Sequence, residues 1–96
     1  MARRHYLVAY DISDDKRRSR VFDALMDVGD HVQYSIFLCD LNPVERVSLR
    51  ACLAGLIDGA EDQIIILDLG DAEESLPGSL ECIGRRYVPP VRVQVV

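Results

Sequence analysis

The sequence of 96 residues lacks the motifs on which zinc enzymes, NTPases and triad hydrolases depend. It contains no Cys-x-x-Cys, no His-x-His and no Glu-x-x-His, and its cysteines, Cys39, Cys52 and Cys82, are widely spaced. These absences argue against a zinc site and a disulfide framework, so we expect three buried, apolar cysteines. The sequence also has no glycine-rich phosphate loop and no Gly-x-Ser-x-Gly, which argues against an NTPase and a serine hydrolase.

Long hydrophobic runs are missing as well. The apolar stretch after Arg3-Arg4-His5 stops at Asp11, which is too short for a signal peptide or a membrane span. We therefore expect a cytoplasmic protein without a membrane partner. The length predicts a single domain over residues 1–96, and a domain this small gains stability from oligomerisation.

Positive charge is scarce overall but concentrated near the start of the chain. The formal net charge is −5, yet residues 1–50 carry eight basic and eight acidic side chains, whereas residues 51–96 carry three and eight. Binding to phosphate follows the local potential, so the basic side chains among residues 1–20 can still hold a nucleic acid. The acidic half predicts that this binding is weak and sensitive to salt.

Hydrophobic periodicity predicts an alternation of strands and helices. We expect strands at 5–10, 31–38 and 63–69, helices at 15–28 and 42–57, a loop at 70–79, and further short strands at 80–83 and 91–96. Ser13 or Asp14 is suited to cap the first helix, and the Asn-Pro-Val-Glu run suits the start of the second. The alternating segment 31–38 either bends or forms two short strands, and the sequence leaves this open.

The order of these elements predicts an α+β fold. The simplest packing is a ferredoxin-like βαββαβ arrangement, an antiparallel sheet with both helices on one face. The valine-rich tail at 91–96 is a candidate for pairing with a second copy of the chain, because an exposed apolar edge favours strand addition.

Asp11 is the strongest candidate for chemistry. It stands where a buried strand gives way to a loop, so its carboxylate is fixed by the strand and open to solvent. One carboxylate does not make a Mg²⁺ site, but a second Asp11 across a two-fold axis, with phosphate and water, would complete one. The alternative, of equal weight, is that Asp11 only forms the turn. We interpret Asp14 and Asp15 as acidic residues that stabilise the helix N-terminus.

The basic cluster beside Asp11 is the candidate phosphate clamp. Arg17, Arg18 and Arg20 lie in the first turns of the predicted helix, and a guanidinium group suits bidentate contact with phosphate. The alternative is an ordinary solvated helix face. Arg3 and Arg4 are expected to extend the same basic surface, as are Arg85 and Arg86.

Two motifs together resemble the CRISPR-associated protein 2 family, the small partner of the CRISPR integrase. The first is Tyr-Asp-Ile-Ser-Asp-Asp at 10–15 with the arginines after it, and the second is Val-Gln-Tyr-Ser-Ile-Phe at 32–37. Glu-Cys-Ile-Gly at 81–84 and the valine-rich tail are also similar to the family. Many members have arginine at the position of His31, and histidine retains a hydrogen-bond donor but not a permanent charge.

The resemblance implies a ferredoxin-like homodimer in which the terminal strand crosses to the partner and Asp11 of each chain faces a shared cleft. It implies that Asp11 binds Mg²⁺ (or Mn²⁺) and is catalytic in an endonuclease acting on single-stranded RNA or double-stranded DNA. It also implies nucleic-acid contacts by arginines matching Arg18 and Arg20, and by His31, and family roles for Tyr10, Ser35 and Phe37. In the family, the dimer also bridges integrase subunits during spacer acquisition, a role for which cleavage is dispensable.

Other functions stay open at this point. A ribonuclease toxin of the virulence-associated D type shares the predicted fold, and so does a ferredoxin-like regulatory module that binds a small ligand. The second of these has no need for clustered arginines beside Asp11. The sequence does not decide between RNA and DNA, or whether cleavage is the physiological role.

Overall fold

In the first strand, β1 (Arg4–Asp11), buried and more exposed side chains alternate, so the strand has two different faces. In this computed structural model, which describes residues 2–72 and 80–88, Tyr6, Val8 and Tyr10 of β1 are buried. The residues between them, Leu7 and Ala9, are half-buried on the opposite face of the sheet. One face of β1 therefore belongs to the core, and the other is available for further contacts.

The first helix, α1 (Asp15–Met26), begins at an Asp14 cap, whose carboxylate accepts the backbone N–H of Arg17 at 2.9 Å. Its apolar stripe buries Val21 and Leu25 completely. The helix ends before the predicted boundary at residue 28, because the chain already enters strand β2 at Gly29. A Cβ at Gly29 would stand 2.5 Å from Cys39 Sγ and 2.9 Å from the Leu38 carbonyl oxygen, so only glycine fits this close approach.

The alternating segment forms a hairpin of two strands, β2 (Gly29–Gln33) and β3 (Ile36–Leu41), with Tyr34 and Ser35 in the turn. This resolves the choice between a bend and two strands. The turn interrupts the alternation of the segment between Gln33 and Ile36, which pair with each other. Phe37 is fully buried in the core, and its ring lies 5.6 Å from that of Phe22 on α1.

The second helix, α2 (Pro43–Leu56), starts as predicted, with a reciprocal capping box. The Asn42 side chain accepts the Glu45 N–H at 2.8 Å, and the Glu45 carboxylate accepts the Asn42 N–H at 2.9 Å. That bond to the Asn42 N–H holds the pKa of Glu45 below its ordinary value. Leu49 and Leu53 bury the inner face of α2 before the chain returns as strand β4 (Gln63–Asp71).

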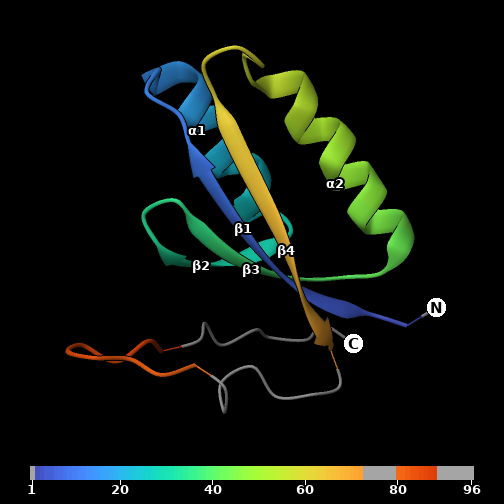
Figure 1. The fold of residues 1–96 in the computed structure, drawn as a ribbon, viewed down its shortest axis with the longest axis vertical. Helices are drawn as coiled ribbons and strands as arrows, with labels where there is room; N and C mark the ends of the chain where they lie inside the picture. Colours follow the sequence, from blue (N-terminus) through green and yellow to red (C-terminus); the bar gives the residue numbers. More distant parts are fainter. Residues whose placement is uncertain (1, 73–79, 89–96) are drawn as a thin grey trace.

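The four strands form one antiparallel sheet in the order β2-β3-β1-β4. Figure 1 shows both helices on the same side of this sheet, so that they leave its other face uncovered. The order and the layering confirm the predicted ferredoxin-like α+β fold. The core between the layers consists of Tyr6, Val8, Tyr10, Ile12, Val21, Leu25, Phe37, Cys39, Leu41, Leu49 and Leu53.

Several expectations for local structure are wrong. Residues 80–83 form no strand; Leu80 and Ile83 are exposed there, the latter at 97%. A strand forms only where a neighbouring strand pairs with it, and the described part of the sheet ends at β2 and β4. Of the cysteines only Cys39 is buried, while Cys52 and Cys82 are exposed. The predicted tail strand at 91–96 and most of the predicted loop at 70–79 lie outside the described residues.

No helix in the described part of the chain is long and apolar enough to cross a membrane.

Candidate nucleic-acid site

Asp11 is the last residue of β1, and its side chain is exposed. Alternation along the strand places it on the same face as Leu7 and Ala9, the face that the helices leave uncovered. Its pairing partner across the sheet is Gln63, the first residue of β4. The carboxylate therefore stands at one end of the open face of the sheet.

Two rows of apolar side chains run across the strands on the open face, next to Asp11. Leu38, Leu7 and Leu67 are paired in one row. The next row consists of Ile36, Ala9 and Ile65. Ile65 and Leu67 are each 52% exposed in the single chain. An apolar surface of this kind on a small domain marks a contact surface.

Arg17 holds α1 to the turn before β4 and is less available for phosphate than the sequence implied. Its Nε donates to Asp62 Oδ2 at 2.7 Å and its Nη2 to Asp62 Oδ1 at 3.2 Å, and the Asp62 side chain is fully inaccessible. The bond from Arg17 holds the pKa of Asp62 below its ordinary value. Sequence reasoning missed Asp62, because no local pattern connects it with a helix 45 residues away.

Arg18 contacts the loop that follows Asp11. Its Nη1 donates to the carbonyl oxygens of Ile12 at 3.1 Å and Ser13 at 3.3 Å, and Nη2 pairs with the Asp15 carboxylate. These contacts fix the backbone directly after the candidate carboxylate. Arg18 is half-exposed, so its outer edge stays open to solvent beside the same loop.

Arg20 and Lys16 are the exposed basic residues near Asp11 for which no carboxylate contact is found in the described part of the chain. Both lie within the first two turns of α1. Arg20 is therefore the arginine of the predicted clamp whose charge is not paired with a carboxylate among the described residues.

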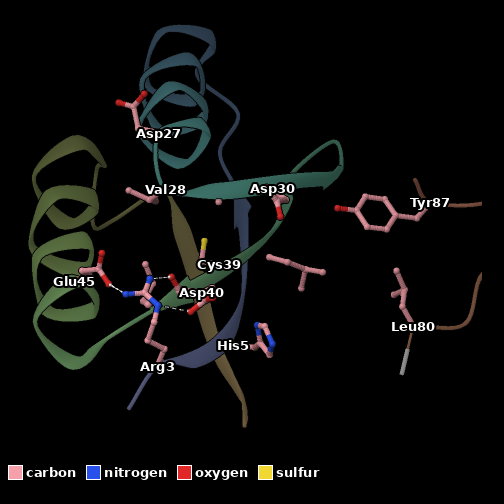
Figure 2. Close-up of a pocket in the computed structure, with 13 residues that line it drawn as sticks. Arg3, His5, Asp27, Val28, Asp30, Cys39, Asp40, Glu45, Leu80 and Tyr87 are labelled. Atoms are coloured by element: carbon pink, nitrogen blue, oxygen red, sulfur yellow. Dashed lines mark hydrogen bonds and ion pairs between the residues drawn. The ribbon is translucent and has the colours of Figure 1, made fainter. Parts of the chain in front are cut away.

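Arg3 and Arg4 lie at the opposite end of β1 from Asp11, about 23 Å along the strand at the usual rise per residue. Arg3 donates to Asp40 and Glu45, each at 2.8 Å, as Figure 2 shows. Arg4 pairs with Asp68 at 2.9 Å. Within one chain these arginines do not extend the surface around Asp11, and their charges are already compensated.

A hollow of about 450 Å³ next to Arg3 is acidic (Figure 2). Arg3 and His5 line it together with four carboxylates, those of Asp27, Asp30, Asp40 and Glu45. An excess of negative charge repels phosphate. This hollow is therefore not the candidate site for a phosphate backbone.

The family-matched residues Tyr10, Ser35 and Phe37 and the predicted contact residue His31 meet around the hairpin turn. His31 Nε2 donates to the Tyr34 carbonyl oxygen at 2.9 Å, and the His31 ring lies 4.9 Å from that of Phe37. The Tyr10 hydroxyl donates to the same carbonyl at 3.2 Å. Burial raises the pKa of Tyr10, so this hydroxyl keeps its proton. A phosphate contact by His31 stays a prediction.

For a metal at Asp11, the described residues of one chain do not supply a full set of ligands. In residues 2–72 and 80–88, no group of at least three His, Cys, Asp or Glu side chains is placed to hold a metal ion. Asp14 caps α1 and Asp15 pairs with Arg18, so both agree with the helix-terminus interpretation. Carboxylate oxygen is the ligand that Mg²⁺ prefers, but a single carboxylate does not complete its coordination.

Comparison with known proteins agrees with the fold. The family model for CRISPR associated protein Cas2 matches residues 4–75. A Rhodospirillum rubrum protein named CRISPR-associated endoribonuclease Cas2 1 is 39% identical over 82 residues, 85% of this chain and 79% of that protein. A Geobacter sulfurreducens CRISPR-associated endoribonuclease Cas2 is 34% identical over 91 residues, 95% of each chain.

The crystal structure of Streptococcus pyogenes Cas2 has the same fold, with a TM-score of 0.74 and 30% identity over 83% of this chain and 99% of that one. The described fold is thus that of a small ferredoxin-like protein of the CRISPR system. The chain belongs to the Cas2 family, as the resemblance of its two motifs predicted.

Proposed function

We propose that this chain acts as a homodimer that holds a nucleic-acid backbone at the Asp11 end of its sheet. The observation that supports this proposal is the position of Asp11. It stands at the end of the uncovered apolar face, next to the arginine-bearing start of α1. Two such faces packed together bury the leucine and isoleucine rows and bring two Asp11 carboxylates toward one cleft. The predicted crossing of the tail strand would add to this interface.

For the activity we propose metal-dependent endonucleolytic cleavage of a phosphodiester. The curated relatives from R. rubrum and G. sulfurreducens are named endoribonucleases, which favours RNA as the substrate. Two Asp11 carboxylates fit a shared Mg²⁺ or Mn²⁺ better than one does, and such an ion supplies charge stabilisation at the phosphate. The residues of this chain then have separate tasks: Arg20 attracts the backbone, and Arg18 keeps the Ile12–Ser13 backbone in place behind Asp11.

In the cell we propose a place in spacer acquisition, as the dimer that bridges CRISPR integrase subunits and binds duplex backbone without reading bases. Membership of the Cas2 family supports this role. It also makes the toxin and the small-ligand module weaker alternatives, since the relatives described above are CRISPR-associated proteins. A cytoplasmic location goes with this proposal.

The deciding experiment compares wild type with Asp11→Asn on end-labelled single-stranded RNA and double-stranded DNA, with Mg²⁺, with Mn²⁺ or with EDTA. We expect cleavage only with metal, loss of cleavage in Asp11→Asn, and an unchanged dimer mass by light scattering. Asp27→Asn is the matched control, because this exposed carboxylate lies at the far end of α1. Cleavage that survives Asp11→Asn would show that the site is elsewhere.

The adaptor role is separated from cleavage by reconstituting spacer integration with the integrase subunit from the same locus. Integration that persists with Asp11→Asn but is lost with an Arg20 variant supports a bridging role that depends on backbone contact. Integration that proceeds equally well without this protein contradicts that role.

A further inference from the structure

The hairpin turn between β2 and β3 presents a tyrosine ring to solvent at the same end of the sheet as Asp11. Tyr34 is 94% exposed. Gln33 and Ile36, which flank the turn, pair with each other and belong to the strands. The backbone N–H of Tyr10 donates to the Ser35 carbonyl at 3.1 Å, which joins this turn to the residue before Asp11. In Figure 1 the turn projects beside the end of β1.

The backbone of this turn is fixed by its neighbours. The Tyr34 carbonyl oxygen accepts two hydrogen bonds, from the Tyr10 hydroxyl at 3.2 Å and from His31 Nε2 at 2.9 Å. The His31 ring itself packs against the rings of Phe22, at 5.1 Å, and Phe37, at 4.9 Å. The backbone that carries the exposed ring is therefore fixed, which lowers the entropy that this turn loses when it binds a partner.

A hollow of about 340 Å³ opens beside the hairpin turn, and Tyr34 is among the aromatic and polar residues that line it. The aromatic members are Tyr10, Phe22, His31 and Tyr34, and the polar ones are Arg18, Ser19, Asp23 and Ser35. An unpaired base binds by stacking on a ring and by hydrogen bonds to the groups along its edge. This hollow combines aromatic residues with hydroxyl, carboxylate and guanidinium groups, which suit both kinds of contact. A paired base inside a duplex offers no free face to such a ring.

We propose that Tyr34 and this hollow bind an unpaired nucleobase of the strand whose backbone passes Asp11. The inference rests on the proposed endonuclease function at Asp11, not on the duplex-bridging role, and adds to it a base contact that single-stranded nucleic acid makes and a duplex does not. Tyr10 and Asp11 are adjacent but point to opposite faces of β1, so the bound base belongs to a nucleotide neighbouring the one at Asp11. Stacking makes this contact tolerant of sequence, because every base has an aromatic face.

The test measures the affinity of full-length wild type, Tyr34→Ala and Tyr34→Phe for a mixed-sequence single-stranded RNA and for an abasic polymer of equal length. We expect Tyr34→Ala to bind the RNA about 5- to 150-fold more weakly and Tyr34→Phe to bind like wild type. Neither variant should change binding to the abasic polymer. The slope of affinity against salt should stay unchanged, since stacking releases no counterions. Val47→Ala, on the exposed side of α2, is the control.

The outcomes separate this inference from the proposed function. If wild type binds neither RNA nor the abasic polymer, the nucleic-acid function itself fails. If wild type binds both and Tyr34→Ala binds RNA equally well, only the base site is wrong. A change of dimer mass in Tyr34→Ala, measured by light scattering, would assign Tyr34 to a contact between copies and overturn the base site. Quenching of a 2-aminopurine base that disappears in Tyr34→Ala supports stacking directly.

Discussion

Arg17 and Asp62 form a two-bond ion pair that joins the first turn of α1 to the turn before β4. The Arg17 side chain is 24% exposed and that of Asp62 is inaccessible, so water screens this pair far less than a surface pair. Asp62 also accepts the backbone N–H of Asp58 at 2.8 Å, which closes the turn. The pair places the start of α1, and with it Arg18 and Arg20, relative to the sheet.

This pair predicts a loss of stability in acid. The folded-state pKa of Asp62 is lowered, so its contribution is present above the ordinary pKa of an aspartate and is lost as the pH falls through the folded value. We expect Asp62→Asn to lower the Tm at pH 7 and its difference from wild type to shrink below about pH 4. Thermal melts between pH 3 and pH 7 measure this. Glu61→Gln is the control, since Glu61 is 67% exposed and lies 3.4 Å from Arg17. Parallel Tm profiles for wild type and Asp62→Asn would contradict the assignment.

Arg18 is predicted to act mainly through the loop that it holds. Lysine keeps the charge but loses the guanidinium fork that reaches the Ile12 and Ser13 carbonyl oxygens. We therefore expect Arg18→Lys and Arg18→Ala to weaken RNA binding to a similar extent, about tenfold. Fluorescence anisotropy with labelled RNA measures both variants. Near wild-type binding by Arg18→Lys would instead indicate a plain charge contact with phosphate.

Arg20 is predicted to contact the backbone directly. Losing one phosphate contact lowers the slope of log affinity against log salt by about 0.7 to 0.9. We expect this change in Arg20→Gln. The matched control is Arg50→Gln, which removes the same charge from the exposed α2 surface. Equal slope changes in the two variants would mean that net charge alone governs binding.

The open face of the sheet predicts a dimer that a single charge can disrupt. Leu67 is 52% exposed at the β4 end of an apolar row, and an aspartate there would bury an unpaired charge on association. We expect Leu67→Asp to be a folded monomer by light scattering and circular dichroism. Val47→Asp, at a site 61% exposed on α2, should remain dimeric. A dimeric Leu67→Asp would place the interface elsewhere.

Two glycines predict opposite effects of the same substitution. Gly29→Ala drives a methyl group into Cys39 Sγ and the Leu38 carbonyl, and we expect it to lower the free energy of unfolding by about 1–3 kcal/mol. Gly55→Ala, within α2 and with nothing within 4 Å of the new Cβ, should raise it by about 0.5–1 kcal/mol. Urea unfolding measures both. A stable Gly29→Ala would show that the β2–β3 pair shifts to accommodate the methyl group.

The sequence by itself determined the elements and the position of Asp11. Periodicity in 15–28, the Asn42 capping box and the alternation of β1 are local properties, so the chain's own spacing predicts them. The same local logic placed Asp11 at a strand end, and two motifs together indicated the family. It failed where a neighbour was needed: Leu80–Ile83 has strand-like residues but no described strand beside it.

Only the tertiary structure decided which arginines are available. Arg17 meets Asp62 across 45 residues of chain, Arg3 meets Asp40 across 37, and Arg4 meets Asp68 across 64. No local pattern predicts such pairs, because the fold brings their elements together. The structure also separated Arg3 and Arg4 from Asp11 along β1. An ion pair or a basic surface depends on distance in space, whereas the sequence specifies only distance along the chain.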